Sequence, residues 1–330
     1  MGGQSLFLPD FVDNLLMAQL ENFRLKVFRT VGEHLSFRKA AELLFLTQPA
    51  VTLQIKALEE DLGMRPLDRS GGHVTLTKQG AILLRYARKI AAIVSEAEQK
   101  LLAREGQLSG ILALGVSTTI AQYVLPRLLA VFLDEHSRLQ LSLHSGNTDA
   151  IVQLLLDNKV SIGLIEGPAR QREVRTEPFL EDKLVLIARP ELEFGHLSRD
   201  QLLASTLLLR EYGSGSRHVV ETALEEAGFK LKSFKNMIEL DSTEAIKSGV
   251  EAGLGVGFVS CWAIHKEIEL GALEVVEVEG LRVTRNYLVV SRVGPEPSGA
   301  AGAFRSFALD RAKHLSEQYE NTRHRNAPSR

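Results

Sequence analysis

The sequence lacks the features that mark several classes of protein. A single cysteine, Cys261, excludes an internal disulfide framework and fits a reducing compartment. No apolar run approaches the roughly 20 residues that span a bilayer, so no membrane partner is expected. Nine His and one Cys show no metal-ligand spacing, and no catalytic triad or carboxylate pair stands in a recognisable active-site context. We therefore expect neither an enzyme nor a bound metal or cofactor.

The start of the chain also lacks the basic residues of a signal peptide, since no Lys or Arg precedes Arg24. We expect residues 1–16 to be a disordered extension of a cytoplasmic protein. Met17 is left open as an alternative start.

Positive and negative charges nearly balance over the whole chain, which carries a net charge of −2. The distribution is uneven, because residues 20–90 hold 12 Lys and Arg against 7 Asp and Glu. A basic N-terminal segment on an acidic body indicates that this segment alone meets a polyanion.

The segment "SFRKAAELLFLTQPAVTLQIKALEEDLG" (36–63) has a proline where a continuous helix would not tolerate one. Ser36 is a good N-cap for one helix, and Thr47 for another that has Pro49 in its first turn. A helix before them is predicted by the helical spacing of Leu20, Phe23, Val27 and Phe28. The last helix should pack inward through Val51, Ile55, Leu58 and Leu62. The two helices of 36–63 describe a helix-turn-helix, whose second helix enters the major groove of double-stranded DNA.

Polar residues on the outer face of that second helix predict base and phosphate contacts. Gln bonds adenine, Thr bonds several bases, and Lys holds phosphate. The following "RPLDRSGGHVTLT" predicts a two-stranded hairpin that forms a wing beside the DNA backbone. The predicted DNA-binding residues are Arg38, Lys39, Thr47, Gln48, Pro49, Thr52, Leu53, Lys56, Arg69 and His73.

Residues 78–105 predict one long helix with an apolar residue at each position of a heptad seam. A helix lying on a globular body could show the same pattern, but a place between two domains favours pairing with a second chain. The predicted dimer contacts are Leu83, Ala87, Ile90, Val94, Ala97 and Leu101.

Residues 106–330 alternate strand and helix patterns, which predicts an α/β fold with ligands at the carboxyl ends of the strands. The chain is long enough for two subdomains with a cleft between them. Hydroxyl groups at helix N-termini, aided by an arginine, favour a small anionic ligand. The predicted ligand-binding residues are Ser117, Thr118, Thr119, Thr148, Asp149, Glu166, Gly167, Ser214, Gly215, Ser216 and Arg217.

The order of elements in residues 17–77, with "AAELL", "TQPAV…QIKALEEDLG" and "DRS…LTKQG", resembles the winged helix-turn-helix of the LysR-type transcriptional regulators. The resemblance implies a bacterial, nucleoid-associated regulator with a C-terminal effector domain like the periplasmic solute-binding proteins, in which the chain crosses between two subdomains twice. We expect these crossings near residues 178 and 295, which gives one subdomain of about 109–178 and 296–318 and one of about 179–295. It also implies homodimers that often form homotetramers, and it allows contact with RNA polymerase.

Two questions stay open in the sequence. The chain could instead be an α/β solute-binding or enzymatic protein whose N-terminal helices serve only to dimerise it. "LIEGP" and "REYGSGSR" are similar to segments of family members that control sulfur assimilation or carbon fixation. The effector could accordingly be a sulfur oxyanion or a phosphorylated metabolite.

Overall fold

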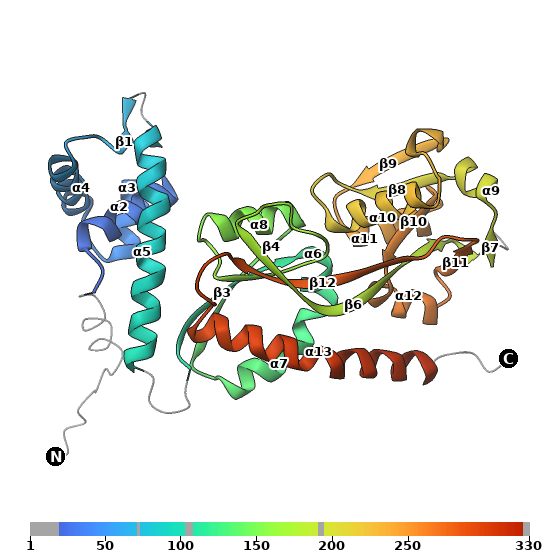
Figure 1. Ribbon diagram of the computed structural model, residues 1–330. Coiled ribbons are helices and arrows are strands. Elements are labelled where there is room, and N and C mark those ends of the chain that lie inside the picture. The colour runs from blue at the N-terminus through green and yellow to red at the C-terminus, as the bar shows by residue number, and fades with distance from the viewer. Residues whose placement is uncertain (1–19, 71–72, 103–107, 191–194, 326–330) are drawn as a thin grey trace, which may run out of the picture. The chain divides into compact units, whose positions relative to one another are not determined.

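The computed structural model describes residues 20–70, 73–102, 108–190 and 195–325 (Figure 1). The chain divides into two compact units between Gly106 and Gln107, and each unit is considered by itself. The expected extension 1–16, the glycine turn at 71–72 and the start of the hinge at 106–107 lie outside the described residues.

The first unit is a winged helix-turn-helix followed by a long helix, as predicted. Its elements are α2 (Phe23–His34), α3 (Phe37–Leu44), α4 (Gln48–Leu62), β1 (Leu67–Asp68), β2 (Thr75–Leu76) and α5 (Lys78–Leu102). The break before α4 is confirmed, because the Thr47 side chain accepts from the Ala50 amide at 3.4 Å and Pro49 lies in the first turn. Ser36 caps α3 in the same way, accepting from the Lys39 amide at 3.1 Å. Strands β1 and β2 pair antiparallel to form the wing.

The core of the first unit is made by one apolar face from each helix. Its fully buried members include Val27, Phe28, Val31, Ala40, Val51, Ile55 and Ala87. Leu62, which was predicted to pack inward, is exposed instead, and so are Leu20 and Phe23 of the predicted first helix. Leu20 precedes α2, Phe23 is the first residue of that helix, and Leu62 is the last residue of α4 before the Gly63 cap. Residues at helix ends extend past the neighbouring helices that would cover them.

The predicted heptad seam on α5 is wrong at its N-terminal end. Ala87 is fully buried in the core of its own unit, and Leu83 packs against the same core. The apolar stripe that begins the seam therefore docks α5 on its own chain. Leu101 lies in α5, but its side chain is outside the described part.

The second unit has one sheet of mixed direction with helices packed on it. Its strands are β3 (Gly110–Ser117), β4 (Leu139–Gly146), β5 (Ile162–Ile165), β6 (Val174–Ala188), β7 (His196–Leu197), β8 (Thr206–Arg210), β9 (Asn236–Leu240), β10 (Val256–Ser260), β11 (Glu274–Val278) and β12 (Val283–Arg292). Its α-helices are α6 (Thr118–Tyr123), α7 (Leu125–Glu135), α8 (Thr148–Leu156), α9 (Arg199–Ala204), α10 (Gly215–Glu226), α11 (Thr243–Glu251), α12 (His265–Glu269) and α13 (Gly299–Arg325). Short 3₁₀ turns cover Leu231–Ser233 and Cys261–Ala263.

The sheet has two halves that share the long strands β6 and β12. Its order is β4-β3-β5-β12-β6-β10-β8-β9, and β11 also pairs with β6. Strands β3, β4 and β5 run parallel in one half, and β8, β9 and β10 run parallel in the other. Figure 1 shows β6 and β12 running from one half to the other. This architecture confirms the α/β fold class predicted from the sequence.

One predicted crossing is misplaced. The pairing of β12 with β6 is irregular between Tyr287 and Leu288, and only residues after this point pair with β5. The chain therefore passes into the first half near 287, earlier than the predicted position near 295. A strand that runs through both halves carries no turn residues that would mark the crossing in the sequence. On β6 the same irregularity lies between Pro178 and Leu180.

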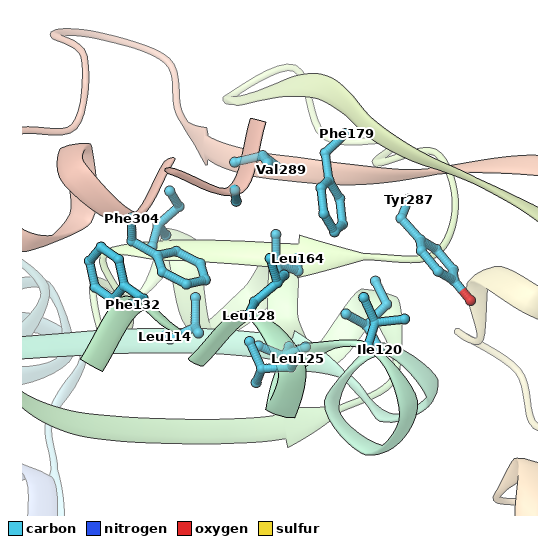
Figure 2. Packing of buried hydrophobic residues seen from close by; sticks show 14 of the residues in the cluster. Leu114, Ile120, Leu125, Leu128, Phe132, Leu164, Phe179, Tyr287, Val289 and Phe304 are labelled. Carbon is cyan, nitrogen blue, oxygen red and sulfur yellow. The ribbon is translucent and has the colours of Figure 1, made fainter. Parts of the chain in front are cut away.

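Each half has its own apolar core. In the first half, Phe132 of α7 and Phe304 of α13 meet edge to face with ring centroids 5.2 Å apart. Figure 2 shows this cluster, with Tyr287 at its far end and its hydroxyl directed away from the other side chains. Tyr287 thus joins the apolar core to the polar groups between the two halves. Among the described helices, none combines the length and apolar character of a membrane span.

Candidate DNA-binding surface and effector site

The N-terminal half of α4 presents the predicted recognition residues outward. Gln48, Pro49, Leu53 and Lys56 are exposed, while Thr52 is half-buried and its hydroxyl donates to the Gln48 carbonyl at 3.0 Å. Thr47 has a structural role as the cap of this helix. The face therefore offers one amide, one ammonium group and two apolar side chains to a groove.

The residues predicted to contact phosphate lie around α4, and their side chains form weak ion pairs at the surface. Arg38 and Lys39 are exposed and lie 3.2 and 3.6 Å from carboxylate oxygens of Glu42. Arg69 lies over the Phe37 ring at 4.4 Å and 3.8 Å from Glu59. Exposed ion pairs contribute little free energy, so these cations can exchange their partners for phosphate. His73, next to the undescribed turn of the wing, is exposed.

In the second unit, Glu166 follows β5 and lies at the junction between the two halves of the sheet. Its carboxylate accepts from the Thr119 amide at 2.9 Å, from Ser216 Oγ at 2.6 Å and from Arg285 Nη1 at 3.1 Å. Burial alone would raise the pKa of Glu166. The charge of Arg285, the hydrogen bond from Ser216, the charge of Arg210 and the hydrogen bond from Thr119 together outweigh burial and hold the pKa below its usual value.

Arg285 of β12 is the centre of this buried network. Its guanidinium also donates to Asp182 Oδ2 at 2.7 Å, to Ser216 Oγ at 2.7 Å and to Tyr287 Oη at 3.3 Å. Burial raises the pKa of Tyr287 well above its usual value, so the phenol stays neutral. Two carboxylates around one guanidinium leave the network with an excess of negative charge.

Arg210, the last residue of β8, forms a second polar group at the junction. Its guanidinium contacts Thr118 Oγ1 and Thr243 Oγ1, each at 3.4 Å. Thr243 begins α11 and its hydroxyl lies 3.1 Å from that of Thr119. Glu211 binds Arg210 through both carboxylate oxygens, at 2.8 and 3.1 Å. Arg210 therefore links hydroxyls from both halves.

The two halves approach each other closely at a pair of glycines. A methyl group added at Gly215 would lie 2.6 Å from Thr148 Oγ1 and 2.8 Å from the Gly167 amide nitrogen. The hydroxyls of Thr148 and Ser117 are buried without a hydrogen-bond partner among the described residues. Each unpaired buried hydroxyl costs about 1–3 kcal/mol.

Three of the predicted ligand residues are engaged by other groups at or near this junction. Asp149 has an exposed side chain, and its amide donates to the Gly213 carbonyl. Ser214 caps α10 by accepting from the Arg217 amide. Arg217 is engaged by Glu221 and Glu239 at 2.7 and 2.6 Å. Ser214 and Arg217 thus shape α10, and Asp149 contacts the segment before it from the first half.

The sequence reasoning missed Arg210, Thr243 and Arg285. Arg210 ends an apolar strand and Thr243 begins a helix, the same signals that identified Ser117 and Thr148. Arg285 alternates with Val283 and Tyr287 on the buried face of β12. A charged residue in phase with buried apolar ones marks a buried ion pair, and this signal could have identified it.

Comparison with protein families gives two matches. Residues 23–81 match the bacterial regulatory helix-turn-helix protein, lysR family, and residues 105–313 match the LysR substrate binding domain. The chain belongs to the LysR family of transcriptional regulators. It is thus a DNA-binding regulator and not an enzyme, as expected.

Curated relatives extend over nearly the whole chain. A RuBisCO operon transcriptional regulator from Allochromatium vinosum is 36% identical over 295 residues, which cover 88% of this chain and 96% of the relative. The HTH-type transcriptional regulator CbbR from Rhodospirillum rubrum is 34% identical, covering 86% of this chain and 94% of the relative.

Solved structures have the same fold. A full-length OxyR variant from Pseudomonas aeruginosa has a TM-score of 0.69 at 22% identity, covering 88% of this chain and 93% of the other. CbnR complexed with its target DNA has a TM-score of 0.62 at 22% identity, and the match covers 88% of this chain and 98% of CbnR. The regulatory domain of CcmR from Synechocystis PCC6803, in complex with 2-PG, has a TM-score of 0.56 at 24% identity. The match covers 63% of this chain and 99% of the CcmR domain.

Proposed function

We propose that this LysR-type regulator controls carbon-fixation genes in response to a small phosphorylated anion bound between the two halves of its second unit. The observation that carries the proposal is the buried guanidinium of Arg210, which bonds the Thr118 hydroxyl of one half and the Thr243 hydroxyl of the other. Cations and hydroxyl donors are the groups that bind phosphate. The RuBisCO regulators among the relatives and the 2-PG complex of CcmR support the same class of target and ligand.

Promoter DNA would be contacted by the exposed face of α4, with Gln48 and Lys56 as its principal polar groups, and by the wing. Phosphate contacts from Arg38, Lys39 and Arg69 would set the orientation of the unit on the duplex. Sequence preference would come from the few side chains of α4 that reach base edges.

A homodimer would form through an apolar stripe on α5 that shares Ile90 with the predicted seam but otherwise differs from it. Ile82, Tyr86, Ile90 and Ile93 are all exposed, and Ile93 keeps 65% of its accessible surface. These residues recur at helical spacing on the face away from Leu84 and Ala87, which are buried. Dimers would pair into tetramers on DNA, where RNA polymerase is a further candidate partner.

The test is a gel-shift titration with DNA upstream of the RuBisCO genes, in the presence and absence of 2-PG. We expect salt-dependent binding whose affinity or footprint changes with 2-PG but not with an equal concentration of sulfate. Unrelated DNA of the same length is the control. Equal binding to both DNAs would contradict the assignment of target genes. A footprint unaffected by any phosphorylated anion would contradict the proposed ligand class.

A further inference from the structure

We propose that Arg210 holds the anionic group of the effector, and that Glu211 is a resident carboxylate which the effector displaces. This inference rests on the proposed function, since it assigns the residues and the regulation of the same site. It starts from a comparison of the three buried arginines at or near the junction, Arg210, Arg217 and Arg285.

The carboxylates around these arginines decide which of them can take a ligand. Arg285 has Glu166 and Asp182 beside it, and Arg217 has its own pair of glutamates. Each of these two clusters carries one more negative than positive charge, so an added anion would be repelled. Among the described residues, the ion pair of Arg210 is with Glu211, and the charge of Arg210 also helps to lower the pKa of the nearby Glu166 carboxyl. The Arg210–Glu211 pair is neutral, and it becomes a cationic site when Glu211 moves away.

Exposure favours Glu211 as the group that moves. The Arg210 side chain is 3% exposed and that of Glu211 is 21% exposed. Arg210 is also held by hydrogen bonds to Thr118 and Thr243. The Glu211 carboxylate, in contrast, is held among the described residues by the Arg210 guanidinium alone. A partly exposed carboxylate can rotate into the solvent at little cost in free energy. A buried guanidinium left without an anion carries a large desolvation penalty. The cost is removed when the ligand supplies that anion.

The predicted donors Thr119 and Ser216 are already occupied. The Thr119 amide and the Ser216 hydroxyl both donate to Glu166, whose carboxylate therefore fills the position that the sequence suggested for the ligand. A second anion beside Glu166 would meet its charge at short range. This arrangement directs the ligand to Arg210 instead.

Hydroxyl groups next to Arg210 complete the site. Thr118 accepts from Arg210 and donates to the Gly146 carbonyl at 3.2 Å, which connects the ends of β3 and β4. Ser117 precedes Thr118 in the chain, and Thr148 follows Gly146 by two residues. The hydroxyls of Ser117 and Thr148 are buried without a partner among the described residues. They are suited to the remaining oxygens of a phosphate or a carboxylate on the same ligand.

The experiment measures binding of 2-PG and of inorganic phosphate to the full chain by calorimetry. The variants are Arg210→Gln, Arg210→Lys and Glu211→Gln, and Glu221→Gln is the matched control because Glu221 pairs with Arg217. Circular dichroism and thermal unfolding establish that each variant is folded. Arg210→Lys retains the charge and serves as the test of binding if Arg210→Gln fails to fold.

We expect 2-PG to bind Glu211→Gln roughly tenfold more tightly than the wild type, because an amide competes less well for Arg210. Arg210→Gln should weaken 2-PG binding by roughly 30-fold or more, Arg210→Lys by less, and Glu221→Gln should not change it. Wild-type affinity in both Arg210 variants would overturn the assignment of Arg210, while the proposed function would stand. Unchanged affinity in Glu211→Gln would overturn displacement. Failure of the wild type to bind either anion would instead overturn the proposed function.

Discussion

Ser216 Oγ donates a 2.6 Å hydrogen bond to Glu166 Oε2, and the two residues come from opposite halves of the second unit. Glu166 follows β5 of the first half, and Ser216 lies in the first turn of α10 in the second. Arg285 touches both of them from β12, the strand that runs through both halves. The relative position of the halves therefore depends on one buried, charged group.

Replacing Glu166 with glutamine should lower the free energy of unfolding by about 3 kcal/mol. Removal of one partner of a buried ion pair costs about 3–5 kcal/mol, and the loss falls at the lower end because Asp182 still neutralises Arg285. Urea unfolding of the full chain measures the change. Glu279→Gln, at an exposed carboxylate, should change stability by less than about 0.5 kcal/mol. Equal stability of the two variants would show that the network is not required.

The same variant should change how stability depends on pH. The pKa of Glu166 is lower in the folded chain than its ordinary value of 4.5, so the unfolded state takes up its proton first. The stabilisation from Glu166 is thus complete above pH 4.5 and is lost as the pH falls below 4.5. The difference in urea midpoint between wild type and Glu166→Gln should shrink over that range. A constant difference from pH 6 down to the acid transition would refute this origin of the stability.

A methyl group at Gly215 should force the two halves apart. Its Cβ would lie 2.6 Å from Thr148 Oγ1, closer than carbon and oxygen can approach without movement. Overpacking of this kind costs about 1–3 kcal/mol, so Gly215→Ala should unfold at lower urea concentration. Gly195→Ala is the control, since nothing lies within 4 Å of its added carbon. Identical midpoints for the two variants would mean that the junction is looser than these distances indicate.

Local rules of helix formation could be read from the sequence, whereas burial between distant segments could not. Thr47 and Pro49 identify the start of α4 because capping depends on neighbouring residues. Ala87 was assigned to a dimer seam because an apolar heptad looks the same whether it packs on its own chain or on another. Glu166 was placed among the ligand residues because its partner Arg285 lies 119 positions away. The sequence places both at buried positions but does not pair them.

Lys56→Ala should weaken binding to promoter DNA and make it less dependent on salt. Lys56 is exposed on the outer face of α4, where an ammonium group would neutralise one phosphate. The slope of log affinity against log salt should fall in magnitude by about 1, without loss of discrimination between specific and unrelated DNA. Lys266→Ala, at an exposed lysine of α12 in the other unit, is the control. An unchanged slope in Lys56→Ala would remove Lys56 from the interface.

Ile93→Glu should dissociate the proposed homodimer. Ile93 is the most exposed residue of the α5 stripe, and complete burial of such a side chain contributes about 2–3 kcal/mol. The dissociation constant from sedimentation equilibrium should rise by roughly 30-fold or more, because the variant also places a charge in an apolar contact. Ser95→Glu adds the same charge at an exposed position on the opposite face of α5 and should leave the dimer intact. If Ser95→Glu dissociates the dimer and Ile93→Glu does not, the partner chain packs on the other face of the helix.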